Sequence, residues 1–417
     1  MKRLMVYLNN EPVGDLTQNA SGLMQFTYRP EWLARKDAMP LSRSLPLENV
    51  MFKGKQARSF FAGILPEEGP RRRIAEVLGI SNQNDFAMLE RIGGECAGAV
   101  SLLPEGVLPP KFNEKLLRKL NSSELEKIIS ELPRRPLLAG EKGLRLSLAG
   151  AQDKIAVTVE GKKIALPLGN TPSTHIIKPE PDRFPGLAVT EWLCMKLARA
   201  IGLNVPDTSL LQVGDKPCIL VQRYDRSLTA DGFVRRIHQE DFCQALGYPP
   251  EHKYQQEGGP LLRDCIALLR EWSTVPALDI RAFLDGVIFN MLIGNADAHG
   301  KNYSLLYQDG ERRMAPFYDL VCTLAWPELS KTPAMKIGRS ESIESITAVH
   351  WKKMAEESSI GWPMVRDRIL QISQTVAKTI RPVEAECASQ NPAKTSEVAD
   401  IIQRRAESIQ EGLAQSL

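Results

Sequence analysis

The chain has 417 residues, of which 43% are hydrophobic and 25% are charged, and it carries a formal net charge of +3. This length and composition are typical of a soluble globular protein with two or three domains or one large two-lobed body. The mild positive charge permits contact with nucleic acid but does not indicate it, because a nucleic-acid-binding surface needs clustered basic residues.

Cysteine usage and the distribution of apolar residues narrow the cellular setting. The seven cysteines include no C-x-x-C pair, so we expect reduced thiols rather than a disulfide framework or a zinc site. No apolar run approaches the ~20 residues of a membrane-spanning helix. The opening residues, MKRLMVYLNNEPVG, have no long apolar core and are not a signal peptide. We therefore expect a cytoplasmic protein that has no membrane partner.

Residues 1–110 are predicted to form an N-terminal α/β subdomain in which short strands are mixed with helices. Segments 4–10 and 11–16 have the pattern of an opening hairpin. Segments 59–67 and 71–80 have the pattern of helices.

After the N-terminal subdomain, a proline-rich segment with one helix is followed by a segment rich in strands. Residues 111–140 form a proline-rich seam around one helix, 121–132, whose first turn Ser122 or Ser123 can cap. Residues 141–226 are predicted to form a strand-rich small lobe, because alternating and β-branched segments dominate it and one helical segment interrupts them.

Residues 227–417 are predicted to form a mainly helical large lobe. The exception is a strand pair that turns at Asp309 and Gly310, and segment 396–417 has the period of an amphipathic helix. A strand-rich small lobe followed by a helical large lobe is the order of a protein kinase. The predicted fold class is therefore α+β, a protein-kinase-like two-lobed fold with an extra N-terminal α/β subdomain.

A polar loop at 293–306, IGNADAHGKNYSLL, lies between an apolar helix pattern and a strand pattern. Asp297 and Asn302 have the D-x-x-x-x-N spacing of a kinase catalytic loop. In such a loop the aspartate accepts the proton of the acceptor hydroxyl, and the asparagine offers an oxygen to Mg²⁺. Asp319, in the sequence PFYDL after the next strand pair, takes the place of the second metal-binding carboxylate, although FYD replaces the DFG order.

The residues that bind phosphates in a kinase can be sought upstream. Lys178 follows two β-branched apolar residues on a predicted strand, where a lysine can bind the α- and β-phosphates. Glu191 lies on the predicted small-lobe helix and is placed to pair with this lysine. The small-residue loop at 147–154, SLAGAQDK, can cradle phosphate oxygens with its N–H groups because its small side chains allow close approach.

Adenine should meet the backbone at the hinge that follows the predicted hairpin 207–225. The hinge residues are Gln222, Arg223 and Tyr224. With the hinge, the sequence offers a candidate for each functional segment of a protein kinase, in the order in which kinases carry them.

Each residue also has a simpler interpretation. Asp297 and Asn302 alone are common turn residues. Asn295, Asp297 and His299 could form a metal cluster, although no second histidine or acidic cluster completes a ligand set. Lys178 could be a strand lysine with an extended side chain, and Glu191 could be a solvated helix residue. The combination of all the parts favours the kinase interpretation.

Five segments, in order and spacing, resemble the HipA family of serine/threonine kinase toxins. They read LSLAGAQDK, THIIKPE, VQRYDR, NADAHGKNYS and PFYDL. The opening VYLNNEPVGDL, with PEWL and PLSRSLPLE, is similar to the N-terminal subdomain of that family. The resemblance covers the chain from residue 4 to beyond residue 320.

The resemblance implies roles for individual residues. Asp297 matches the catalytic base, and Asn302 and Asp319 match the ligands of Mg²⁺. Lys178 matches the phosphate-binding lysine. The matched nucleotide-binding positions are Ala149, Gly150, Ala151, Gln152, Asp153, Lys154, Lys178, Gln222, Arg223, Tyr224, His299, Lys301, Asn302, Tyr318 and Asp319.

The resemblance also implies regulation. Ser147 matches the serine that members of the family autophosphorylate, which displaces the phosphate loop and silences the enzyme. A phosphate at this position adds roughly −1.5 to −2 charges beside a loop that binds phosphates. Basic neighbours such as Arg145 could hold the displaced loop.

The resemblance further implies ATP and Mg²⁺ as cofactors and a toxin–antitoxin module as the setting. The partner would be a small helix-turn-helix antitoxin that binds operator DNA, and the substrate would be an aminoacyl-tRNA synthetase. Segment 335–346, MKIGRSESIESI, mixes basic with acidic residues, so direct contact with DNA should be weak or indirect. Two alternatives remain open, a small-molecule phosphotransferase and a catalytically silent co-repressor scaffold.

Overall fold

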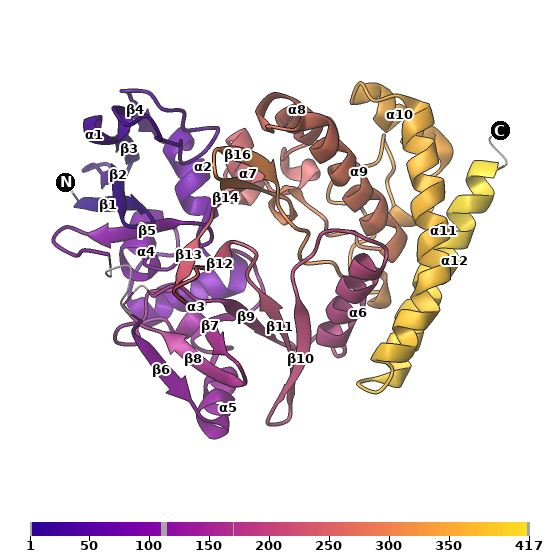
Figure 1. Ribbon diagram of the computed structural model, residues 1–417, viewed down its shortest axis with the longest axis horizontal. Coiled ribbons are helices and arrows are strands. Elements are labelled where there is room, and N and C mark those ends of the chain that lie inside the picture. Colours follow the sequence, from indigo (N-terminus) through magenta and orange to yellow (C-terminus); the bar gives the residue numbers. More distant parts are fainter. Residues whose placement is uncertain (1, 110–114, 170, 415–417) are drawn as a thin grey trace. The chain divides into compact units, whose positions relative to one another are not determined.

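The computed structural model describes residues 2–109, 115–169 and 171–414. The predicted boundary between residues 110 and 111 and the last three residues of the predicted C-terminal helix lie outside these ranges. The chain divides into two compact units (Figure 1). Unit 1 comprises Met1–Pro179, Leu211–Pro250 and Leu306–Gly310, and unit 2 comprises Glu180–Leu210, Glu251–Leu305 and Glu311–Leu417.

Strands and helices alternate through the first half of the chain, and long helices dominate its end. The strands are β1 Lys2–Leu8, β2 Glu11–Gln18, β3 Met24–Tyr28, β4 Met51–Lys53, β5 Val100–Pro104, β6 Leu117–Leu120, β7 Ile155–Glu160, β8 Lys163–Pro167, β9 His175–Pro179, β10 Thr208–Val213, β11 Lys216–Gln222, β12 Arg226–Leu228, β13 Val234–Arg236, β14 His238–Asp241, β15 Ser304–Gln308 and β16 Glu311–Met314. The α-helices are α1 Pro30–Leu33, α2 Lys55–Gly63, α3 Glu68–Leu78, α4 Asp85–Ile92, α5 Ser122–Glu131, α6 Leu187–Ala200, α7 Phe242–Leu246, α8 Leu262–Trp272, α9 Pro276–Ile293, α10 Ala348–Glu357, α11 Trp362–Cys387 and α12 Pro392–Ala414.

Among its described residues, unit 1 contains a five-stranded sheet, a six-stranded sheet and the two-stranded sheet β12–β13. The N-terminal sheet has the strand order β4-β3-β2-β1-β5, so the predicted opening hairpin is β1–β2. Alternate residues of β3 are buried, and Phe26 and Tyr28 meet edge to face at 4.8 Å between ring centroids. Such alternation places one face of a sheet on a core and leaves the other face more exposed.

The second sheet of unit 1 has the order β10-β11-β9-β7-β8-β6. The helix beside β6 is α5, and the prediction that Ser122 or Ser123 caps it is wrong. Asn121 is the cap, because its side chain accepts the N–H of Glu124 and the Glu124 carboxylate accepts the N–H of Asn121. Asparagine is among the strongest N-cap residues, and the reciprocal pair satisfies two N–H groups of the first turn.

A cluster of ionic side chains is buried in unit 1. Glu95 accepts hydrogen bonds from the guanidinium groups of Arg223, Arg226 and Arg236. Its backbone pairs with the segment that contains Ser147, since Ser147 N–H donates to the Glu95 carbonyl at 2.9 Å. One residue therefore joins the N-terminal region, the start of the 147–154 loop and the segment after β11.

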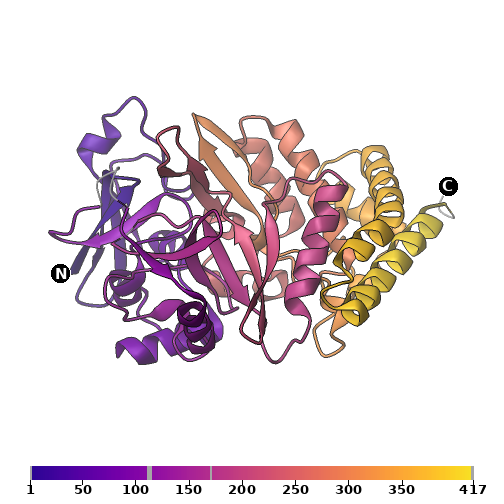
Figure 2. The same cartoon turned by 60° about the horizontal axis from the view of Figure 1, so that its bottom comes forward.

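Unit 2 is built around α9, which is buried on almost every side in its second half. The long helices α11 and α12 lie side by side as an antiparallel pair, and α6 packs against them (Figures 1 and 2). Such long helices with one buried stripe are stabilised mainly by this packing and only slightly by intrinsic helix propensity.

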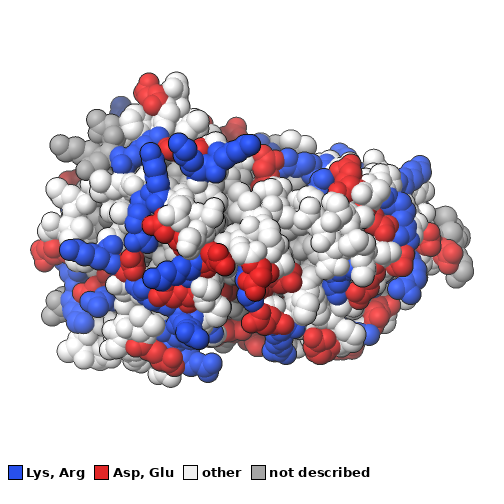
Figure 3. Space-filling model, turned by 90° about the horizontal axis from the view of Figure 1, so that it is seen from below, with Lys and Arg blue, Asp and Glu red and all other residues white. Residues whose placement is uncertain are grey.

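The exposed surface carries charged side chains of both signs, and the cysteine side chains are buried. On the face seen in Figure 3, acidic and basic side chains lie close to one another over most of the surface. The cysteines at positions 96, 194, 218, 243, 265, 322 and 387 are all buried, and none of them forms a disulfide. Within the described ranges, no helix has the length and apolar character that are needed to cross a bilayer.

Candidate active site

The polar loop begins where α9 ends. Gly294 is the first residue after the helix and has φ +74°, a left-handed conformation that favours glycine. A side chain here would also collide with Leu324, whose Cδ1 lies 2.8 Å from the position of an added Cβ. The I-G-N sequence therefore ends the helix sharply and starts the loop at a fixed point.

Buried amide groups fix the first half of the loop. Asn295 Nδ2 donates to Asn290 Oδ1 of α9 at 2.8 Å, and Asn295 Oδ1 accepts the N–H of Asp297 at 3.1 Å. Thr323 Oγ1 accepts the N–H of Ala296 at 2.9 Å. Buried polar groups that are satisfied in this way impose one conformation, because an unpaired group would be costly.

A cation supports the helix end that precedes the loop. Arg405 of α12 donates through Nε to the carbonyl of Met291 at 2.9 Å and also binds the carbonyl of Ile343. The carbonyl end of a helix carries partial negative charge, which a buried guanidinium stabilises. No local sequence pattern predicts this contact, because Arg405 lies 114 residues after Met291.

Asp297 is the exposed residue of an otherwise buried stretch. Its Oδ1 accepts a hydrogen bond from Tyr254 Oη at 2.8 Å. The ring of Tyr254 also meets the ring of His299 edge to face at 5.2 Å. Sequence reasoning missed Tyr254, which precedes the short 3₁₀ turn Gln255–Glu257 and matches no motif.

Asn302 closes the second half of the loop. Residues Gly300–Asn302 form a 3₁₀ turn, and Asn302 Oδ1 accepts the N–H of His299 at 3.0 Å. The amide Nδ2 of Asn302 lies 3.5 Å from Asp319 Oδ2. The structure thus brings together the two side chains that the sequence assigned to Mg²⁺.

Asp319 has an unusual backbone. Its φ is +54°, in the left-handed region that non-glycine residues rarely adopt. The Asn295 side chain donates to its carbonyl at 3.3 Å, and the neighbouring Tyr318 Oη donates to the Lys301 carbonyl at 2.7 Å. Strained conformations of this kind occur where surrounding contacts hold a functional group in place.

The donor set around Asn302 and Asp319 fits a hard divalent cation. Carboxylate and amide oxygens are the protein ligands that Mg²⁺ accepts, and it keeps several waters besides. Among the described residues, no group of three or more His, Cys, Asp or Glu side chains could hold a metal. The alternative cluster of Asn295, Asp297 and His299 contains an asparagine, so this result does not test it; the Asn295 amide donates to Asn290 Oδ1 and accepts the N–H of Asp297.

The predicted phosphate loop lies in unit 1 and is held by the N-terminal region. Gly150 has φ +108°, and an added Cβ would lie 2.6 Å from Lys154 Nζ. The N–H of Glu67 donates to the Gly150 carbonyl at 3.1 Å, and Lys154 Nζ donates to the Ala149 carbonyl at 2.7 Å. Only glycine suits this position, as expected for a loop that approaches a ligand with its backbone.

Side chains add two further attachments to the N-terminal region. Arg73 of α3 forms an ion pair with Asp153 at 2.6 Å. Ser147 is fully buried, and its Oγ donates to the Ile64 carbonyl at 3.0 Å. Arg145 does not face outward, because its guanidinium binds the carbonyls of Leu89, Glu90 and Leu102. The expectation that Arg145 receives a displaced loop is therefore not favoured.

Lys178 lies on β9, opposite Ile219 of β11, and is largely buried. Gln152 of the phosphate loop donates to the Pro179 carbonyl at 3.3 Å, so this loop touches the strand next to Lys178. Glu191 is a buried residue of α6 in unit 2. Its pairing with Lys178 stays a prediction.

The predicted hinge follows β11. Gln222 is exposed and pairs with His175 of β9, and the N–H of Arg223 donates to the Thr174 carbonyl at 2.9 Å. The Arg223 side chain is buried and binds Asp225 at 2.7 Å as well as Glu95. Any contact of Arg223 with a nucleotide would therefore use its backbone.

A buried carboxyl joins the N-terminal region to two later strands of unit 1. Glu240 of β14 accepts hydrogen bonds from Ser42 Oγ, the N–H of Arg43 and Tyr307 Oη. Burial raises the pKa of Glu240 from 4.5 to about 7. Burial also lowers the pKa of the neighbouring His238 to about 4. These groups were not found from sequence because no local pattern marks them.

Comparisons with known proteins identify the family. Residues 4–103 match the model of the HipA N-terminal domain, and residues 146–383 match that of the HipA-like C-terminal domain. The chain belongs to the HipA family. It is 44% identical over 408 residues to a putative kinase, Y4mE, of Sinorhizobium fredii, with 97% of each chain covered. It is 29% identical over 392 residues to the serine/threonine-protein kinase toxin HipA of Shewanella oneidensis, with 91% of this chain and 89% of that one covered.

A solved structure gives the same result for the fold. The HipA chain in a complex of Shewanella oneidensis HipA, HipB and operator DNA matches with a TM-score of 0.87 and 26% identity, over 99% of this chain and 98% of that one. The predicted α+β, kinase-like fold is therefore confirmed. The predicted enzyme class, a serine/threonine protein kinase, is confirmed as well, and membership of the HipA family supports a kinase toxin.

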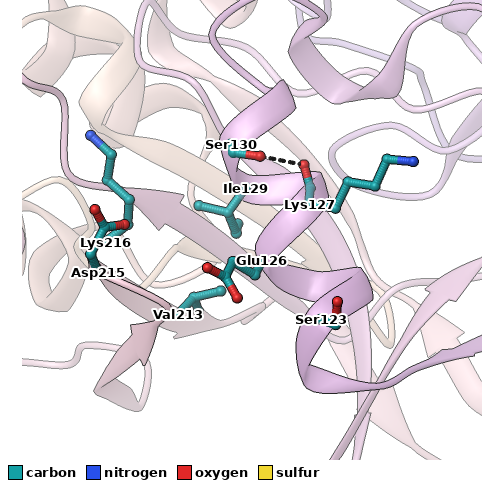
Figure 4. Close-up of a pocket in the computed structure, with 8 residues that line it drawn as sticks. All are labelled: Ser123, Glu126, Lys127, Ile129, Ser130, Val213, Asp215 and Lys216. Atoms are coloured by element: carbon teal, nitrogen blue, oxygen red, sulfur yellow. Dashed lines mark hydrogen bonds between the residues drawn. The ribbon is translucent and has the colours of Figure 1, made fainter.

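One hollow of unit 1 lies apart from every predicted site residue. It has a volume of about 420 Å³ and lies between α5 and the turn of the β10–β11 hairpin (Figure 4). Glu126 and Ile129 point toward the hairpin, and Lys127 points away from it. Its polar residues carry both signs of charge and no group of catalytic character, so we assign it no chemistry.

Proposed function

We propose that this HipA-family kinase uses ATP and Mg²⁺ to phosphorylate serine or threonine of another protein, as the toxin of a toxin–antitoxin module. The observation that supports this most is the arrangement around the catalytic loop. Asp297 is exposed beside the hydrogen-bonded side chains of Asn290, Asn295 and Thr323. Asn302 Nδ2 lies 3.5 Å from Asp319 Oδ2. A positioned base beside a set of hard oxygen ligands is what phosphoryl transfer requires.

Each residue has a distinct role in this proposal. Asp297 orients the acceptor hydroxyl and accepts its proton. Asn302 and Asp319 hold Mg²⁺, which when bound neutralises charge on the phosphate oxygens. The backbone of 149–154 and the ammonium group of Lys178 bind phosphates, while Gln222 to Tyr224 present backbone groups to adenine. His299, Lys301 and Tyr318 contribute to the nucleotide site.

The proposed partner is supported by a solved relative, and the proposed substrate rests on the family resemblance alone. The matched Shewanella protein is seen with HipB and operator DNA, so we propose a helix-turn-helix antitoxin as the partner of this chain. We propose an aminoacyl-tRNA synthetase as the substrate, because the family resemblance points to it. In segment 335–346, Lys336 pairs with Glu341, which argues for indirect rather than direct contact with DNA.

Autophosphorylation of Ser147 is proposed as the off-switch. Ser147 is fully buried and donates to the Ile64 carbonyl. A dianionic phosphate cannot stay in such a place without its own partners. Phosphorylation would therefore keep the segment out of the core, and the phosphate loop would leave with it because the two are contiguous.

Phosphoproteomics after brief expression tests the proposal. Cells that express the wild type should gain phosphoserine or phosphothreonine on a small set of proteins, and cells that express Asp297→Asn should not. Purified wild type should carry phosphate on Ser147, and Asp297→Asn should lack it. Equal phosphorylation by both proteins would rule out Asp297 as the base.

A further inference from the structure

The catalytic loop carries a contact that none of the predicted roles uses, the hydrogen bond from Tyr254 to Asp297. The phenol oxygen lies 2.8 Å from Asp297 Oδ1, within the normal range for an O–H donor on a carboxylate. Asp297 has two carboxylate oxygens, so a donor on Oδ1 leaves Oδ2 for an acceptor hydroxyl. The contact is therefore compatible with proton transfer to the same side chain.

The segment that carries Tyr254 is fastened to the catalytic loop through its backbone. The N–H of Gln255 donates to the Ala334 carbonyl at 2.9 Å, and the N–H of Ala334 donates to the Ala296 carbonyl at 2.8 Å. The Gln255 side chain also accepts the N–H of Lys336 at 2.8 Å. Three segments that are distant in sequence are thus linked beside Asp297.

Further contacts fix the phenol ring. Gly259 N–H donates to the Tyr254 carbonyl at 2.9 Å, and a Cβ on Gly259 would lie 2.7 Å from that carbonyl oxygen. Lys253 Nζ lies 5.1 Å from the ring centroid, and the His299 ring lies 5.2 Å from it. The hydroxyl is therefore presented to Asp297 by a constrained segment.

We infer that Tyr254 is a positioning residue for the proposed kinase reaction, which holds the Asp297 carboxylate in the orientation needed to accept the proton of the acceptor hydroxyl. A base must lie within hydrogen-bond reach of that proton in a defined direction, and an exposed carboxylate does not keep one direction unaided. A third group that orients the base is a recurring solution in enzymes. The inference rests on the proposed function and adds a residue that no motif includes.

The first test removes only the phenol oxygen. Tyr254→Phe should lower kcat for transfer from ATP to dephosphorylated casein roughly 10- to 100-fold, the range for one hydrogen bond to a charged group. The KM for ATP should stay within about twofold, because Tyr254 has no proposed contact with nucleotide. Tyr7→Phe is the matched control, since its phenol donates only to Met5 Sδ at 3.7 Å in β1 and its loss should leave kcat unchanged.

A double-mutant cycle separates orientation of the base from a merely structural role. If Tyr254 acts through Asp297, then Tyr254→Phe combined with Asp297→Asn should be no slower than Asp297→Asn alone. A structural defect would add to the loss. A second variant, Gln255→Leu, keeps the phenol but removes the acceptor of the Lys336 N–H, so it should lower kcat by a smaller factor than Tyr254→Phe does.

The outcomes are distinct. Wild type without any transfer to casein or release of phosphate from ATP would overturn the proposed function, and the inference with it. An active wild type with unchanged or faster turnover in Tyr254→Phe would overturn the inference alone. Additive losses in the double mutant would also overturn it, while equal rates in the double and Asp297→Asn proteins would support it.

Discussion

The predicted catalytic loop and the predicted phosphate loop of this kinase are fixed in different ways. The catalytic loop, 295–302, is held by side chains of its own neighbourhood, with Asn290 and Thr323 bonded to it directly. The phosphate loop, 147–154, is held by the N-terminal region, through the backbone of Glu67 and the side chain of Arg73. The first loop is therefore held by residues of unit 2 close to it, and the second is held by contacts with the N-terminal region of unit 1.

The largest expected effect concerns the proposed base, Asp297, and the proposed ligand of the cation, Asp319. Asp297→Asn and Asp319→Asn should each lower transfer from ATP by ~10²-fold or more, because a base or a ligand of the cation is lost. Neither side chain belongs to the apolar core, so the melting temperature should change little. Steady-state kinetics with labelled ATP, together with a thermal melt, measure both quantities. Turnover by Asp297→Asn at the wild-type rate would contradict the assignment.

The second prediction concerns pH and the attachment of the N-terminal region. Glu240 has a pKa of about 7 in the folded state against an ordinary 4.5, so folding takes up a proton between these values. Its contribution to the free energy of unfolding should therefore fall as pH rises from 4.5 through 7, by on the order of 3 kcal/mol. The pKa of His238 is lowered to about 4, so its contribution to the free energy of unfolding falls as pH drops below 6.5.

Comparison with Glu240→Gln isolates this contribution. Chemical denaturation of both proteins at several pH values between 5 and 8 should give a difference in stability that shifts steadily in favour of the variant as pH rises. The His238 contribution cancels because both proteins contain it. A difference that is constant with pH would show that Glu240 does not titrate in this range.

The third prediction tests whether the catalytic loop depends on its own network. Asn290→Leu removes the shorter of the two hydrogen bonds that Asn295 Nδ2 donates, and it also removes the Asn290 Nδ2 donor that lies 3.2 Å from Tyr303 Oη. An unsatisfied buried group costs about 1–3 kcal/mol, so the free energy of unfolding should fall by that amount. Denaturant titration measures it, with Leu292→Met, a volume-conserving change in the same helix, as the control.

The smallest expected effect concerns the phosphate loop. Arg73→Ala removes the ion pair between Arg73 and Asp153. The two side chains are 29% and 21% exposed, so the pair contributes only about 1 kcal/mol to the stability of the loop. ATP should bind roughly fivefold more weakly in calorimetry, because the loop is ordered less often before binding. Arg72→Ala on the same helix is the control. Unchanged affinity would show that the backbone contacts of Glu67 suffice.

The sequence predicted which nearby residues lie together well and distant contacts poorly. Asp297, Asn302 and the hairpin that leads to Asp319 lie close together in the sequence. One helix end and one 3₁₀ turn are therefore enough to bring Asp297 and Asn302 near Asp319. Tyr254, Arg73 and Arg405 reach their loops from remote positions, and a single sequence does not show which remote polar residue pairs with which loop. The Asn121 cap was missed for a smaller reason, since three consecutive polar residues all suit that position.

The buried cysteines give the molecule a built-in set of unfolding reporters. Cys96, Cys218 and Cys243 lie in unit 1, and Cys194, Cys265, Cys322 and Cys387 lie in unit 2. Burial raises the pKa of Cys96 to about 12, so a thiol reagent can reach this sulfur in reactive form only when the surrounding structure opens. The labelling rate at each cysteine therefore records how often its part of the chain opens, and mass spectrometry can follow both units in one native sample without any engineered probe.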